Sequence, residues 1–126
     1  MWIETVSSDV GELPSLRRRA IAHLQDLGAS GDLDLIAVLL SELTANAARH
    51  APGPRSISVT VARGVARVEV RDCSSDLPRV LDVDPTRVGG NGMRLVDGLA
   101  ERWGVDREGQ GKVVWFEVPI TQATPA

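Results

Sequence analysis

Aromatic residues and cysteine are scarce in this chain of 126 residues, which has three Trp, one Phe, no Tyr and one cysteine, Cys73. So few aromatic side chains cannot form a platform on which nucleic-acid bases stack. The net charge of −3 also excludes a broad basic surface for nucleic acid. A single cysteine forms no disulfide within the chain, so we expect Cys73 to be a small packing residue.

Long apolar runs are missing as well. No stretch approaches the length of a membrane span, and the first residues, MWIETVSSDVGEL, lack the basic and apolar regions of a signal peptide. Hydrophobic residues make up 43% of the chain and charged residues 25%, which is typical of a soluble globular protein. We therefore expect one cytoplasmic domain with one core, in direct contact with neither membrane nor nucleic acid.

The apolar residues that are present recur with two periods. Their spacing predicts helices at residues 14–27, 32–51 and 93–102, and strands at residues 2–6, 56–62, 65–71, 103–107 and 112–119. Strands and helices occur in groups, and the strand pairs have hairpin connections. This order predicts an α+β fold of two layers, with an antiparallel or mixed sheet and the helices on one face. We assign residues 1–120 to this domain and residues 121–126 to a flexible C-terminal tail.

Three polar side chains lie along one edge of the second predicted helix, in the run SELTANAARHA (41–51). At about 100° per residue, Glu42, Asn46 and Arg49 fall within roughly 60° of one another, beside an apolar stripe. Carboxylate and amide oxygens suit Mg²⁺, a carboxylate can deprotonate a hydroxyl, and a guanidinium can bind phosphate. The pattern equally fits a helix rim that forms an ion pair with another element.

Two later features extend this pattern. Asp72 ends a predicted strand, where its carboxylate can accept a hydrogen bond from the amine of a purine or simply serve a turn. The run Gly89–Gly92 precedes a helix, so its backbone N–H groups can approach phosphate, although a plain flexible loop is the alternative. Taken in order, the features describe a nucleotide pocket beneath a mobile loop. The phosphate-binding fingerprints of the Walker and Rossmann types are absent.

The motifs ELTANAARHA (42–51), VEVRD (68–72), GGNGMRLVDGLAERWGV (89–105) and GKVVWFEVP (111–119) resemble those of the GHKL ATPases. More narrowly, they resemble the small anti-sigma-factor serine/threonine kinases. The resemblance implies the Bergerat ATP-binding fold, an α+β sandwich with a mixed, mostly antiparallel sheet. It also implies that the protein binds ATP with Mg²⁺ and acts as an ATP-dependent protein serine/threonine kinase.

The same resemblance assigns roles to individual residues. Asn46 would ligate Mg²⁺, Glu42 would be the general base for a serine hydroxyl, and Asp72 would accept the adenine amino group. Further contacts with the nucleotide are implied for Arg49, Arg87, Gly90, Asn91, Gly92 and Met93. The implied partners are an anti-sigma-factor antagonist, which would be phosphorylated, a sigma factor, and a second copy of the chain in a homodimer.

Two positions depart from the family pattern. Ser74 stands where the family has glycine after the aspartate, and Lys112-Val113 stands where a threonine is usual in the closing strand, so that Val113 lacks the hydroxyl. Both changes would weaken ATP binding. An alternative function is therefore that of a docking module that binds nucleotide weakly or not at all. A further alternative is a detached histidine-kinase catalytic domain.

Overall fold

The computed structural model describes residues 2–5, 13–48, 54–73 and 92–122. Three helices and seven strands lie within these ranges. The helices are α1 (Leu13–Asp26), α2 (Leu33–Ala48) and α3 (Gly92–Leu99). The strands are β1 (Trp2–Thr5), β2 (Ala29–Ser30), β3 (Pro54–Ala62), β4 (Val65–Asp72), β5 (Arg102–Glu108), β6 (Gly111–Pro119) and β7 (Thr121–Gln122). None of the described helices is long and apolar enough to cross a membrane.

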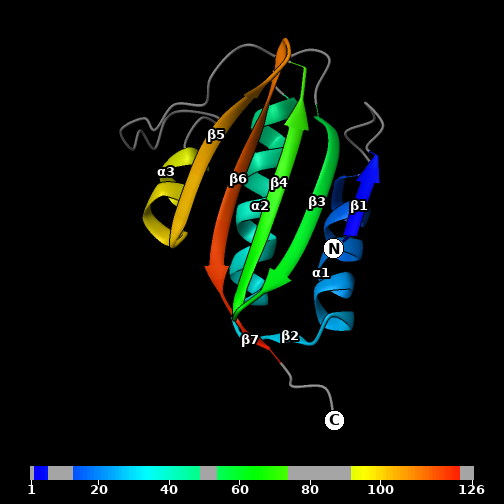
Figure 1. Ribbon diagram of the computed structural model, residues 1–126, viewed down its shortest axis with the longest axis vertical. Coiled ribbons are helices and arrows are strands. Elements are labelled where there is room, and N and C mark those ends of the chain that lie inside the picture. The colour runs from blue at the N-terminus through cyan, green and yellow to red at the C-terminus, as the bar shows by residue number, and fades with distance from the viewer. Residues whose placement is uncertain (1, 6–12, 49–53, 74–91, 123–126) are drawn as a thin grey trace.

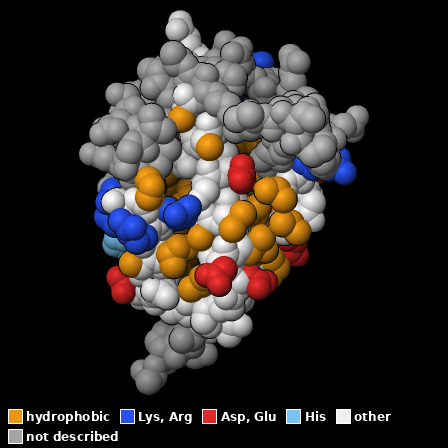
Figure 2. Space-filling view, turned by 180° about the vertical axis from the view of Figure 1, so that it is seen from behind, with side chains coloured by type: hydrophobic (Ala, Val, Ile, Leu, Met, Phe, Trp, Pro, Cys, Tyr) orange, Lys and Arg blue, Asp and Glu red, His pale blue; other side chains and the backbone are white. Residues whose placement is uncertain are grey.

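Five of the strands form one sheet in the order β1-β3-β4-β6-β5, and each neighbouring pair is antiparallel. The helices cover one face of this sheet (Figure 1), so the domain has the two layers that the sequence predicts. Figure 2 shows the helix side, where hydrophobic side chains are visible between charged ones; the most exposed large ones on α2 and α3 are Val38, Leu95 and Leu99. Leu95 and Leu99 are one helical turn apart, so they lie on the same face of α3.

The core lies between α1, α2, α3 and the inner face of the sheet, the face toward the helices. Side chains alternate along each strand, so every second residue of β4 and β6 points inward. The buried inward residues of these two strands are Ala66, Val68, Val70, Val114, Phe116 and Val118. The matching helix residues of α2 are Ile36, Leu39, Leu40, Leu43 and Ala47. The same alternation places Asp72 and Lys112 on the inner face.

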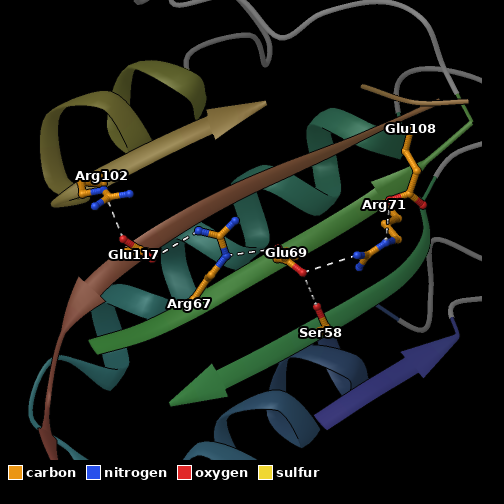
Figure 3. A network of polar contacts seen from close by, with 7 residues as sticks. All are labelled: Ser58, Arg67, Glu69, Arg71, Arg102, Glu108 and Glu117. Atoms are coloured by element: carbon orange, nitrogen blue, oxygen red, sulfur yellow. Dashed lines mark hydrogen bonds and ion pairs between the residues drawn. The ribbon is translucent and has the colours of Figure 1, made fainter. Parts of the chain in front are cut away.

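The outer face of the sheet carries a network of charged side chains that pair with one another (Figure 3). Arg67 binds Glu69 at 3.1 Å and Glu117 at 3.2 Å, and Glu117 also binds Arg102 at 3.3 Å. Arg71 reaches Glu69 at 3.5 Å. Partly exposed pairs of this kind each contribute little to stability. They do show that the polar groups of the outer face mainly contact each other.

Turn chemistry confirms the predicted hairpin between β3 and β4. Arg63 and Gly64 have φ angles of 55° and 76°, the left-handed values that a two-residue hairpin turn of type I′ requires. Gly28 follows α1 with φ 87°, as expected for a C-terminal cap.

Some details differ from the sequence expectations. The helix predicted at residues 93–102 ends at Leu99, and Arg102 already belongs to β5. Thr121 and Gln122, assigned to a flexible tail, form β7, which pairs with Ser30 and Ala29 of β2. Strands of two residues are too short to show a period, so neither was predicted. Residues 123–126 lie outside the described part of the chain. Cys73, expected to be a packing residue, is exposed.

Candidate functional site

The chain path brings the polar edge of α2 to the same end of the molecule as Asp72. Only residues 49–53 separate α2 from β3, so β3 begins near the C-terminal end of α2. Pro54, the first residue of β3, is in register with Asp72, the last residue of β4. Glu42 and Asn46 lie in the second half of α2. Helix α2 covers the inner face of the sheet (Figure 1), and the alternation of β4 places Asp72 on that same face. The predicted catalytic, metal and base-binding residues thus share one end of one face.

Glu42 and Asn46 lie at the rim of the helix layer. Both are partly buried, while their neighbours Leu43 and Ala47 are in the core. Among the residues that the structure describes, none forms a hydrogen bond or ion pair with the Glu42 side chain. Within the described ranges, the alternative of a rim residue in an ion pair is therefore not seen.

Asn46 supplies an amide oxygen at the same rim, one helical turn after Glu42. Within the described ranges, no group of three or more His, Cys, Asp or Glu side chains is arranged to hold a metal ion. A dedicated protein cage for a metal is therefore not formed by these residues. A single protein donor, the amide oxygen of Asn46, suits a Mg²⁺ ion that keeps several of its waters and is held mainly by the phosphates of a substrate.

Asp72 forms a buried ion pair, which the sequence did not predict. The Lys112 ammonium donates a hydrogen bond from Nζ to Oδ1 of Asp72 at 3.0 Å. The Lys112 side chain is only 1% exposed and the Asp72 side chain only 2%. They face each other because Asp72 and Lys112 are paired residues of β4 and β6. The carboxylate predicted to accept a purine amine therefore already has a cationic neighbour.

Gly111 allows β4 and β6 to come together at this point. A Cβ atom at Gly111 would overlap the carbonyl oxygen of Asp72. Any larger residue would have to push the end of β4 away from β6. The glycine thus keeps Asp72 in register with Lys112.

A hollow of about 620 Å³ lies at this end of the sheet, between the end of β4 and the β5–β6 turn. Its lining includes Ser56, Arg71, Asp72, Cys73 and the segment 108–111. Arg71 belongs to the outer-face network, where it reaches Glu108 at 3.5 Å. The hollow is therefore lined partly by residues of the outer-face network and partly by Asp72, whose side chain is only 2% exposed.

The other predicted contacts are placed only in part. Gly92 is the first residue of α3, and the Met93 side chain is buried in the core at 2% exposure. This leaves the backbone of Met93, rather than its side chain, for a phosphate. Arg49, Ser74, Arg87, Gly90 and Asn91 lie outside the described residues.

Val113 is buried, but the alternation of β6 turns it away from Asp72, and the residue opposite Asp72 is Lys112. Of the two residues that depart from the family pattern in this strand, Lys112 therefore faces the Asp72 carboxylate and Val113 does not. The alternation along β6 already indicated that Lys112 lies on the same face as Val114, Phe116 and Val118. That it pairs with Asp72 could be recognised only from the register between β4 and β6.

Comparisons with known proteins show the family and the fold of the chain. The profile of a family described as "Histidine kinase-like ATPase domain" matches residues 6–118. No curated protein matches the chain closely enough to count as a relative. A solved structure of the Erythrobacter litoralis EL346 blue-light activated histidine kinase is similar, with a TM-score of 0.52 and 22% identity over 86% of this chain. The histidine kinase domain from the same protein gives the same three values. The matches span 42% and 61% of the lengths of those two chains, so the likeness concerns the fold.

Proposed function

The chain belongs to the histidine kinase-like ATPase family, and from this premise we propose that it binds ATP with Mg²⁺ and phosphorylates a serine of a partner protein. The observation that carries the proposal is the position of Glu42 and Asn46 on the α2 rim, on the same face and at the same end as Asp72. A phosphoryl transferase needs a proton acceptor, a metal ligand and a base-binding group at one site.

Each of these residues has a definite task in the proposed reaction. Asn46 would hold Mg²⁺ on the phosphates through its amide oxygen, and the bound ion would neutralise their negative charge. Glu42 would accept the proton of the serine hydroxyl while the serine oxygen forms a bond to the γ-phosphorus. At the same time the bond between the γ-phosphorus and the oxygen that bridges it to the β-phosphate would break. Asp72 would accept a hydrogen bond from the adenine amine. Most of the rate enhancement would come from positioning and electrostatics.

The partners are proposed from the sequence resemblance. The phosphorylated protein would be an anti-sigma-factor antagonist, and the kinase would hold a sigma factor until that antagonist competes for it. A homodimer would be the functional unit, acting in the cytoplasm on transcription. None of the described residues is assigned to a contact with these partners.

A second candidate function is that of a detached histidine-kinase catalytic domain. The similar solved structures favour it, since both belong to a histidine kinase. A third is a docking module, which the buried Asp72–Lys112 pair favours, because this pair already occupies the base-binding carboxylate. The phosphorylated product distinguishes the first two, and its absence supports the third.

The test is transfer from γ-labelled ATP, with Mg²⁺, to antagonist proteins encoded by the same genome. A phosphoserine survives acid, whereas a phosphohistidine is lost in acid and survives alkali. The proposal expects an acid-stable product whose modified residue is identified as serine by mass spectrometry. An acid-labile product would support the histidine-kinase alternative. ATP binding without any transfer would support the docking module.

A further inference from the structure

Lys112 is the only lysine in the chain, since thirteen of the fourteen basic residues are arginine. It takes an inward position on β6, in the same series as the buried residues Val114, Phe116 and Val118. Lysine is rarely buried, because removing its charge from water is unfavourable unless the charge is paired. Lys112 is thus the charged residue in a series that is otherwise apolar, and the group that pairs with its charge is the Asp72 carboxylate.

The ion pair places a hydrogen-bond donor and an acceptor side by side. Asp72 Oδ1 and Lys112 Nζ are 3.0 Å apart, both on the inner face of the sheet. Adenine offers the complementary pattern on its Watson–Crick edge, where the N6 amine is a donor and the adjacent N1 is an acceptor. A carboxylate alone would read only the amine. The carboxylate and the ammonium together can read both positions.

We propose that Lys112 determines the specificity of the nucleotide site by donating a hydrogen bond to adenine N1 while Asp72 accepts one from N6. This inference rests on the proposed ATP binding. An ammonium has three N–H bonds and a carboxylate about four lone-pair positions. Both residues already take part in other interactions besides their pair. Donation to N1 therefore requires the ammonium to turn on its flexible four-carbon stem without leaving Asp72.

N1 is favoured over N7, the other ring acceptor beside the amine. The sugar and the phosphates are attached to the five-membered ring, which also contains N7. If Glu42 and Asn46 hold the phosphate end at the rim of α2, the six-membered ring is the part that enters deepest. N1 then lies nearer than N7 to the buried pair.

The test compares ATP with two analogues on the wild-type protein, by calorimetric titration with Mg²⁺. In 1-deaza-ATP a C–H group replaces N1, and in 7-deaza-ATP a C–H group replaces N7; both keep the amine. A hydrogen bond from a charged donor predicts that 1-deaza-ATP binds about tenfold or more weakly than ATP. We expect 7-deaza-ATP to bind like ATP.

The outcomes separate this inference from the proposed function. Equal affinity for all three nucleotides would overturn the role of Lys112 and leave ATP binding intact. A loss confined to 7-deaza-ATP would equally overturn the N1 contact. Failure of ATP itself to bind would overturn both proposals.

Two further measurements tie the preference to Lys112. In Lys112→Met the ratio of the 1-deaza-ATP and ATP affinities should fall to about one. In the control Arg107→Met the ratio should stay as in the wild type, since exposed Arg107 is the β5 residue in register with Lys112.

Removing a buried charge can unfold a protein, so the wild type supplies a second test. Protein labelled with ¹⁵N-lysine has one lysine ammonium, whose NMR signal should shift with ATP and differently with 1-deaza-ATP; identical shifts would contradict the contact.

Discussion

Glu42→Gln is expected to lower the rate of phosphoryl transfer by about 10²–10⁴ while leaving the affinity for ATP unchanged. Glutamine has nearly the same shape as glutamate but cannot accept the proton of a serine hydroxyl. The Glu42 side chain forms no hydrogen bond or ion pair with another described residue, so the change should also leave the free energy of unfolding nearly unaltered. The measurement is the initial rate of transfer from labelled ATP, with ATP affinity determined on the same preparation.

The matched control is Glu101→Gln, which removes an exposed carboxylate in the turn between α3 and β5. Transfer by this variant should proceed at the wild-type rate. If Glu42→Gln also transferred at that rate, Glu42 could not be the general base. A parallel loss of ATP affinity would assign Glu42 to binding instead of proton transfer.

Asp72→Leu is expected to lower the free energy of unfolding by about 3–5 kcal/mol, because it leaves the Lys112 ammonium buried without its carboxylate. This is a large part of the roughly 5–15 kcal/mol that stabilises a typical domain. The double variant Asp72→Leu/Lys112→Met should recover this loss, since an apolar pair of similar volume often equals or exceeds a buried ion pair in stability. Urea unfolding followed by circular dichroism measures all three proteins.

An exposed ion pair provides the comparison. Arg102 is 68% exposed and binds Glu117 at 3.3 Å on the outer face. Arg102→Met should therefore cost less than about 1 kcal/mol. A cost of that small size for Asp72→Leu would contradict the burial of the pair. A double variant no more stable than the single one would show that Lys112 is held mainly by its other contacts.

The fold was largely predictable because its elements are long enough to show a period. Alternation in β4 and the apolar stripe of α2 each extend over several repeats, and Arg63-Gly64 provided the turn between β3 and β4. The pairing of β2 with β7 was missed because two residues on each side carry no periodic signal. Their contact depends on the tertiary path of the chain.

The site was predictable only as far as local spacing extends. Glu42 and Asn46 are one helical turn apart, so their common edge could be derived from the sequence. The pairing of Asp72 with Lys112 joins residues 40 positions apart, and it depends on a strand register that no local pattern specifies. The exposure of Cys73 has the same origin, because it follows from where β4 ends.

The central claim is that the polar rim of α2 binds a magnesium nucleotide. Calorimetric titration of ATP into the wild type and into Asn46→Ala, each with and without Mg²⁺, tests it most directly. We predict Mg²⁺-dependent binding by the wild type and its loss in Asn46→Ala, with less than about 1 kcal/mol of lost stability because Asn46 is only partly buried. A stable Asn46→Ala protein that binds ATP with unchanged affinity, or a wild type that binds no ATP, would contradict the claim.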